Sequence, residues 1–438
     1  MFTKSRFVEL KRIILTNKTN SSEGGLIERS SYIWNTVSGL LMAFQSVIML
    51  FILMRVCDVL VAGVFTIAYA NANLFLNIGK YGMRQYQVTD RIGQFSFREY
   101  RCSRLITSAA MMVAGCAYLA YSSISFGYSF DKTLVVLVMC LFKLVDAVED
   151  VYHAEYQQQG RLDVGAKVLT MRLATTILVF AGFVVMFGDL LPALVLATMY
   201  TALFFLGETA FVKRRYALPH LVGELHKKQV GELLKACFPL FVAAFLLFYI
   251  GNAPKYAIDA IMSDADQAYF GFIAMPVFVV GLLAGFVYNP MIANLADEWR
   301  RSEIRQFWMR FVRLTLVIVG ITLFCVGCAW VAGVPVLNLL YNTDVSPYFD
   351  ELIILVAGGG FLSMTSLATL GITIIRYQRV LIWGYVLVAI LSLVASWWSV
   401  TNFGITGAAW TYFFSMVLLT VIFCICFALG VRSTAKQE

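Results

Sequence analysis

The sequence predicts an all-α, polytopic membrane protein with about twelve transmembrane helices, arranged as two six-helix halves around a central cavity. Of its 438 residues, 60% are hydrophobic and only 14% are charged, whereas soluble domains are about 45–50% apolar and about 25% charged. Many apolar segments reach the roughly 20 residues that a helix needs to cross a bilayer. They do not alternate between apolar and polar residues, as the strands of a transmembrane barrel do.

The apolar segments divide the chain into twelve predicted spans joined by short connections. Such connections leave no room for an inserted soluble catalytic domain. The predicted spans lie near residues 31–54, 57–79, 105–123, 132–155, 166–187, 190–211, 235–259, 267–292, 308–331, 348–375, 380–399 and 404–430.

The placement of charge supports this division and gives an orientation. With the N-terminus inside, the inside segments contain 30 of the 34 basic residues, and the exceptions are Arg55, Lys132, Lys143 and Lys255. Because cytoplasmic loops collect Lys and Arg, both termini are predicted to be cytoplasmic and the protein to lie in the cytoplasmic membrane. The net charge of +8 therefore reflects topology and does not indicate nucleic-acid binding. The outside loops carry Asp131, Asp189, Asp264, Asp266, Asp344, Asp350 and Glu351.

A long basic connection in the middle of the chain divides it into two halves. Six spans on each side give both halves the same orientation, as in transporters whose substrate path lies between two parallel repeats. The predicted parts are a basic cytoplasmic N-terminal segment (1–30), an N-terminal half (31–212), a cytoplasmic linker (213–234), a C-terminal half (235–430) and a cytoplasmic tail (431–438).

The fourth span has the densest set of charges at membrane depth. Lys143, Asp146, Asp150 and His153 recur at steps of three or four residues, which puts them on one helical face, and Glu149 flanks it. Each such charge costs about 2.5–3.5 kcal/mol on insertion scales, so these residues are candidates for function. Lys143 would bind an anionic substrate, and one of the acids would carry a proton or a sodium ion. Alternatively, Lys143 and Asp146 simply neutralise each other as an i,i+3 pair.

The seventh span ends in a second polar group around a proline. Pro254 removes a backbone donor and is expected to kink the helix, and Asn252, Lys255 and Asp259 surround it. A cation beside such a kink would suit a cavity for a phosphate-bearing ligand, with Asp259 as a possible ion-coupling acid. Alternatively, Lys255 extends to the outer interface and pairs with Asp259.

Three further charges are weaker candidates. Arg55, at the outer end of the first hairpin, is a candidate substrate contact or an ordinary partner of Asp58. Arg84, just after the second span, is a candidate substrate contact at the cytoplasmic end. Glu208 in the sixth span is an intramembrane acid, with Lys213 as its expected partner. No metal site or cofactor is predicted.

Three stretches together resemble the polysaccharide-transporter branch of the multidrug/oligosaccharidyl-lipid/polysaccharide exporter superfamily, the flippases of lipid-linked oligosaccharides. The first ends the second span and reads GKYGMRQYQVTD at residues 79–90, followed by residues 95–101. The second covers residues 146–161, with Arg172 after it. The third is the NAPKY stretch at residues 252–256.

This resemblance implies a polyprenyl-pyrophosphate-linked oligosaccharide, or a related cell-surface polymer precursor, as the substrate. Two rocking halves would carry it across the membrane by alternating access. A pyrophosphate needs a cationic, hydrated path through the membrane, while its polyprenyl tail can stay in lipid. The implied partners are the lipid-linked glycan, membrane lipid, and a polysaccharide polymerase and glycosyltransferases of the same pathway.

Two other functions remain open. A proton- or sodium-coupled drug or cation antiporter of the same superfamily would have an acid-dominated cavity, whereas the expected cavity here has mixed charge. A membrane enzyme, such as a polysaccharide polymerase, would present a sizeable outer loop with arginine, histidine or metal-binding acids. The longest predicted outer loop, near residues 341–351, is short and lacks histidine. The chain is therefore predicted to be a transporter and not an enzyme.

Overall fold

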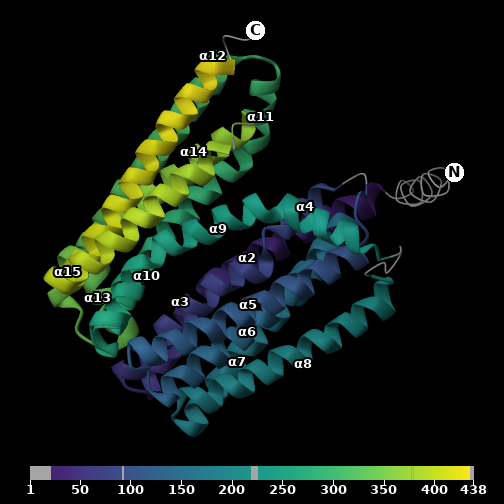
Figure 1. Cartoon of the computed structure of the whole chain (residues 1–438). Helices are drawn as coiled ribbons and strands as arrows, with labels where there is room; N and C mark the ends of the chain where they lie inside the picture. Colours follow the sequence, from purple (N-terminus) through teal and green to yellow (C-terminus); the bar gives the residue numbers. More distant parts are fainter. Residues whose placement is uncertain (1–20, 91–92, 219–224, 376, 378, 435–438) are drawn as a thin grey trace.

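The computed structural model describes residues 21–90, 93–218, 225–375, 377 and 379–434 (Figure 1). Most of the predicted N-terminal segment, part of the linker and the end of the tail lie outside these residues. Every regular element in the described ranges is a helix. The main ones are α2 (Ser21–Val56), α3 (Val59–Lys80), α4 (Met83–Thr89), α5 (Phe97–Ser125), α6 (Phe130–Gln158), α7 (Leu162–Phe187), α8 (Leu190–Tyr216), α9 (Lys227–Ile261), α10 (Asp264–Tyr288), α11 (Ile292–Arg300), α12 (Ile304–Cys328), α13 (Val334–Tyr341), α14 (Phe349–Ile374) and α15 (Arg379–Thr434).

Ten helical stretches in the described part of the chain are long and apolar enough to cross a membrane, so the protein is a multi-pass membrane protein. The 29-residue helix α6 is not among them, because it carries the charged face of the fourth predicted span. Each of the twelve predicted ranges nevertheless falls mainly within a helix or within one part of α15. Within the predicted linker, α8 continues to Tyr216 and α9 begins at Lys227.

Helix α15 contains two predicted spans and reverses direction between them. Gly404 has φ 57° and ψ −134°, which interrupts the helix in a region that favours glycine. The hydroxyls of Ser399 and Thr411 lie 2.6 Å apart, although twelve residues of straight helix would separate them by about 18 Å. The two parts of α15 are therefore antiparallel arms.

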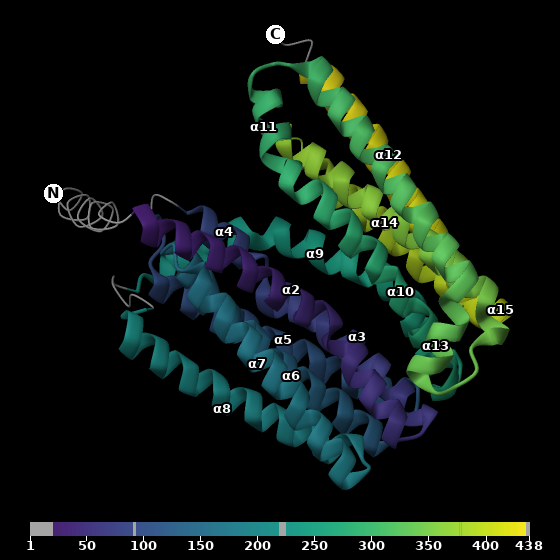
Figure 2. The same cartoon turned by 180° about the vertical axis from the view of Figure 1, so that it is seen from behind.

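The helices form two groups that diverge like the arms of a V (Figures 1 and 2). One group contains α2–α8 and the other α10–α15, while α9 packs against α15 on one side and against α3 and α5 on the other. The groups meet where α3 packs against α10 and α2 against α13. There, a Cβ atom on Gly63 would overlap the backbone carbonyl of Asp264, so only glycine permits this close approach of α3 and α10.

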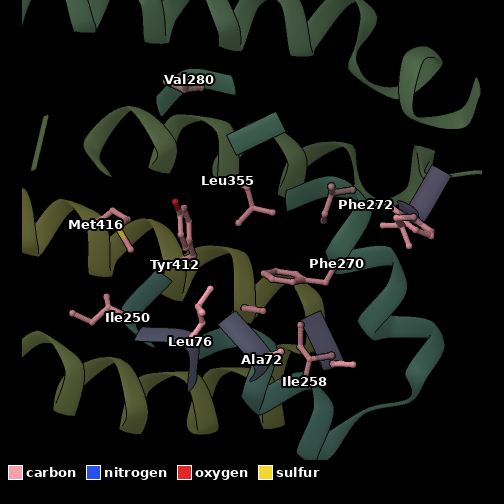
Figure 3. Packing of buried hydrophobic residues seen from close by; sticks show 14 of the residues in the cluster. Ala72, Leu76, Ile250, Ile258, Phe270, Phe272, Val280, Leu355, Tyr412 and Met416 are labelled. Carbon is pink, nitrogen blue, oxygen red and sulfur yellow. The ribbon is translucent and has the colours of Figure 1, made fainter. Parts of the chain in front are cut away.

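One hydrophobic core passes through α9 and connects both groups. It includes Leu76 of α3, Ile250 and Ile258 of α9, Phe270 of α10 and Tyr412 of α15 (Figure 3). In a membrane, such contacts stabilise the fold mainly through close van der Waals packing, because lipid is as apolar as the side chains.

Basic and acidic loop residues are distributed unequally between the two ends of the V. The start of α2, the end of α15, α4 and α11 lie at the diverging end (Figure 1). This end carries basic residues of α4, α8 and α11, including Arg84, Arg215 and Arg300. The α10 N-terminus and the turn after α13 lie at the converging end, where Asp264 and Asp344 are found.

Candidate functional site

Arg172 lies at the centre of a buried ionic network inside the α2–α8 group. It comes from α7 and is 1% exposed. Its Nη2 atom lies 2.6 Å from an oxygen of Asp146 and 2.6 Å from an oxygen of Glu149, both on α6. Its Nη1 atom donates to the Thr201 hydroxyl of α8 at 2.7 Å. One guanidinium thus joins α6, α7 and α8, with the planar, multiple-donor geometry that arginine provides.

Lys143 belongs to the same network and has polar partners in three directions. Its Nζ atom lies 3.1 Å from Asp146, 3.0 Å from the side-chain oxygen of Gln45 on α2 and 3.3 Å from the Tyr69 hydroxyl on α3. It also lies 4.6 Å from the centre of the Tyr69 ring. The expected i,i+3 pair of Lys143 and Asp146 is confirmed.

Asp150 connects α6 to the helices on its other side. One oxygen lies 2.7 Å from Arg104 Nη2 of α5 and the other lies 3.4 Å from Arg84 Nη1 of α4. Arg104 is fully buried and also donates to the Gly79 carbonyl at 2.7 Å, which ties it to the end of α3. Arg84 donates to Gln157 at 3.1 Å. Asp146 and Asp150 therefore each have two cationic partners, and their role in ion coupling remains a prediction.

Glu149, His153 and Glu208 form a separate corner of the network. His153 Nε2 lies 3.3 Å from one Glu149 oxygen and 3.9 Å from one Glu208 oxygen, and the three side chains bring one donor or acceptor atom each within 4.8 Å of one another. All three residues are buried. Lys213, the expected partner of Glu208, is exposed instead, so Glu208 faces α6 and not a basic loop.

Asp259 lies at the converging end and does not contact Lys255. Its oxygens face Lys132 Nζ of α6, at 2.8 Å, and the hydroxyl of Tyr128. Lys132 also contacts Asp264 of α10 at 2.6 Å. The expected neutralisation of Asp259 by Lys255 is therefore wrong. This cluster of Tyr128, Lys132, Asp259 and Asp264, called the clasp below, joins α6 to α9 and α10.

Lys255 has no hydrogen bond or ion pair with any residue that the structure describes. Helix α9 continues through Pro254 to Ile261, so the proline does not end the helix, and the expected kink stays a prediction. Nearby, the Asn252 amide donates to the Phe248 carbonyl of its own helix at 3.0 Å. A Cβ atom on Gly251, one turn before Lys255, would meet open space. Lys255 therefore lies one turn from a position on α9 against which no described residue packs closely.

Arg55 contacts the other helix group and not its expected partner Asp58. Its Nη2 atom donates to the Leu339 carbonyl of α13 at 2.6 Å. Its guanidinium lies 5.2 Å from the centre of the Phe51 ring. Asp58 instead accepts a hydrogen bond from the Val59 backbone and caps α3. Arg55 thus reinforces the converging end together with the clasp.

The structure brings together five of the predicted site residues and leaves the others apart. Arg84, Lys143, Asp146, Glu149 and Asp150 share the network, while the α9 residues and Arg55 lie elsewhere. Sequence reasoning missed Arg104 and Arg172, which pair with these acids, because both lie near the ends of apolar segments and were counted as topology signals. It also missed Lys132, an exception in the charge count, as the partner of Asp259.

The comparisons with known proteins show a fold relationship at low sequence identity. No family model and no curated protein sequence matches the chain. A solved inward-facing structure of a multidrug resistance MATE family transporter of the MOP superfamily matches with TM-score 0.72 and 10% identity, over 93% of this chain and 99% of that one. An outward-facing structure of such a transporter matches with TM-score 0.58 and 11% identity, over 94% and 96%.

A lipid II flippase, MurJ, in an inward closed conformation matches with TM-score 0.68 and 10% identity, over 91% of this chain and 87% of that one. These structural neighbours are transporters and not enzymes. At about 10% sequence identity, these matches show a shared fold but do not identify the substrate. The chain therefore shares the fold of these membrane transporters.

Proposed function

We propose that the protein is a twelve-span transporter of the cytoplasmic membrane with both termini in the cytoplasm. The basic end of the V would then face the cytoplasm, as the positive-inside tendency requires. The helix groups diverge at this same end, so the arrangement would be inward-facing. The higher TM-score with the inward-facing neighbour, 0.72 against 0.58 for the outward-facing one, supports this.

The orientation predicts which engineered cysteines react from outside the cell. In a cysteine-free variant, Asp264→Cys and Asp344→Cys should react with a membrane-impermeant maleimide added to intact cells. Arg301→Cys should react only after the cells are opened, because it follows α11 at the basic end. Reaction of Arg301→Cys in intact cells would contradict the proposed orientation.

We further propose that the substrate is a polyprenyl-pyrophosphate-linked oligosaccharide or a related cell-surface polymer precursor, moved by alternating access. The observation that carries this proposal is the unpaired Lys255. Arg84, Arg104, Lys143 and Arg172 all have carboxylate partners. An uncompensated lysine at membrane depth costs about 2.5–3.5 kcal/mol, which favours a functional reason for it. A phosphate group is an anion that would supply the missing partner.

The position of Lys255 suits a substrate that moves between two helix groups. Helix α9 contacts both groups, so a headgroup bound to this helix would respond to their relative movement. Asn252 lies one turn earlier, with an amide oxygen that accepts no hydrogen bond from the described residues, and is proposed as a second contact. Arg55 lies at the converging end of the V and Arg84 at the diverging end, and we propose that they contact the substrate only at exit and entry, respectively.

An apolar cavity between the groups would accommodate part of the lipid tail. It has a volume of about 390 Å³ and is lined by α2 residues Phe44 and Val47 on one side and by α10 residues including Phe278 on the other. Its remaining walls come from α12, α13 and α14. A hydrocarbon chain in this cavity would replace lipid at little cost, while the charged headgroup stayed at α9. A polymerase and glycosyltransferases would act as partners of the same pathway.

Replacement of Lys255 tests the substrate class. In proteoliposomes that contain a fluorescent polyprenyl-pyrophosphate-linked sugar, Lys255→Ala should reduce the rate of translocation at least about tenfold, the effect expected when about 1.4 kcal/mol of interaction is lost. Lys255→Arg should retain intermediate activity, because it keeps the charge but changes its geometry. The readout is the fraction of label that a reductant on one side can quench.

Lys228→Ala is the matched control, because Lys228 lies on the same helix but its side chain is 89% exposed. This control should translocate like the wild type. A Lys255→Ala variant that is correctly inserted and fully active would overturn the substrate contact. Because Asp259 already pairs with Lys132, loss of Lys255 does not leave this acid unpaired, so the single variant can be interpreted directly.

The drug or cation antiporter remains the second candidate, because a multidrug MATE transporter shares the fold. A cationic drug would need an accessible acid in its path, whereas Asp146, Asp150 and Asp259 are paired with cations. Glu208 lacks a Lys or Arg partner but is buried where α8 faces α6. The same proteoliposomes loaded with a cationic dye distinguish the two. Export of the dye without movement of the lipid-linked sugar would favour the antiporter.

A further inference from the structure

The corner formed by Glu149, His153 and Glu208 contains polar atoms that nothing in the described structure satisfies. One oxygen of Glu149, Nε2 of His153 and one oxygen of Glu208 are all buried without a hydrogen-bond partner. The residues are 2%, 4% and 8% exposed. Buried polar groups are normally satisfied, and each exception requires an explanation. Three exceptions that face one another point to a bound species that bridges them.

We propose that Glu149, His153 and Glu208 form a buried site for one exchangeable proton, which holds α8 against α6. Glu208 is the central residue, because it is the charged residue on the inward stripe of α8. This stripe runs through Thr201, Phe205, Glu208 and Val212 at steps of three or four residues. A bridging proton would allow the Glu208 carboxyl group to donate to Glu149 or His153 and connect the two helices.

The charges close to the site favour a monovalent cation over a divalent one. On the Arg172 side of the network, Arg172 and Lys143 contribute two positive charges, whereas Asp146, Glu149 and Glu208 contribute three negative charges when all are ionised. Asp150 with Arg84 and Arg104 forms a second set on the other side of His153. One proton makes the first set neutral, and a neutral set is the favoured state in a low-dielectric interior. A divalent ion would leave an excess positive charge close to the Arg172 guanidinium, which already lies 2.6 Å from Glu149.

The remaining groups around Glu208 are compatible with a proton. From α6, the Tyr156 hydroxyl is buried without a hydrogen-bond partner near Glu208, and Asp150 lies beyond His153 with its two arginines. From α7, Arg172 is the charged group that faces the site. Arg84 of α4 lies on the far side of His153, about one-third exposed, and is occupied by Asp150 and Gln157.

Loss of this proton would leave a buried carboxylate without a partner, which is strongly unfavourable unless water reaches it. Helix α8 would then separate from α6 at its cytoplasmic end or admit water there. The consequence for transport rests on the proposed function: the proton would couple a pH gradient to movement of the α2–α8 group. The existence of the proton site does not depend on that function.

Infrared difference spectroscopy of the purified full-length protein tests the site directly. A pH step should produce a protonated-carboxyl band that disappears in Glu208→Gln, a substitution that mimics the protonated acid and should therefore fold. Glu298→Gln is the control, because Glu298 pairs with Arg310 at 2.6 Å and lies outside the proposed site, so the band should remain. A band that persists in Glu208→Gln, or binding of Zn²⁺ that depends on Glu208, would overturn the proton site.

Transport in proteoliposomes separates this inference from the proposed function. Glu208→Gln should abolish the dependence of translocation on an imposed pH gradient but retain translocation without a gradient. Unchanged pH dependence, or dependence on a sodium gradient alone, would overturn the coupling role. If the infrared band is lost as expected but the wild type does not translocate the lipid-linked sugar, the proton site stands and the proposed function fails.

Discussion

Replacing Arg172 with methionine is expected to destabilise the protein by about 3–5 kcal/mol, the range found when one partner of a buried ion pair is removed. Methionine keeps most of the side-chain volume but removes the guanidinium that contacts Asp146 and Glu149. Asp146 retains Lys143, whereas Glu149 is left with His153 only. The loss should appear as a clear decrease in the thermal midpoint measured by fluorescence-detected size-exclusion chromatography.

Arg300→Met serves as the control, because Arg300 pairs with Asp297 at the surface with a side chain that is 77% exposed. Such exposed pairs contribute little, so the midpoint should hardly change. Adding Glu149→Gln to Arg172→Met should restore part of the lost stability, because it removes the unpaired buried carboxylate. An Arg172→Met variant as stable as the wild type would refute the central position of this arginine.

Breaking the clasp is expected to open the converging end of the V. Lys132→Met leaves Asp259 buried beside Asp264 without its cation, a penalty of about 3–5 kcal/mol that applies only while the helices are together. A change of this size shifts a two-state equilibrium by more than about 100-fold. The buried Thr66, which faces Gly271 between α3 and α10, provides the reporter.

In a cysteine-free background, Thr66→Cys should react slowly with an external impermeant reagent and much faster when Lys132→Met is added. Lys228→Met, which changes an exposed lysine on α9, should not alter the rate. The double variant Lys132→Met/Asp259→Asn removes both charges and should slow the reaction again. Equal reaction rates with and without Lys132→Met would exclude the clasp as the contact that holds this end closed.

Features that depend on local sequence could be predicted well. The twelve ranges correspond to helical segments because each is defined by a continuous apolar run, and Gly404 interrupts α15 within one residue of the predicted gap. The pairing of Lys143 with Asp146 was also predictable, because residues three apart on a helix are neighbours. These conclusions require no knowledge of which helices pack together.

Features that depend on tertiary packing could not be predicted. The sequence suggested Lys255 as the partner of Asp259 because they lie one turn apart, but Lys132 from α6 reaches Asp259 instead. Arg172 looked like a cytoplasmic residue near the start of an apolar run, whereas α7 already begins at Leu162 and buries it. Partner choice between helices depends on their rotation and neighbours, which a single sequence does not encode in a readable pattern.

The charged face of α6 also has a consequence for biogenesis. Taken alone, this helix is too polar to partition readily from the translocon into lipid, since each central charge costs about 2.5–3.5 kcal/mol. The shortest ion pairs of its acids are with Arg104 of α5 and Arg172 of α7. We therefore expect α6 to remain at the translocon until α7 has been synthesised. The two helices should then enter the lipid together as a helical hairpin.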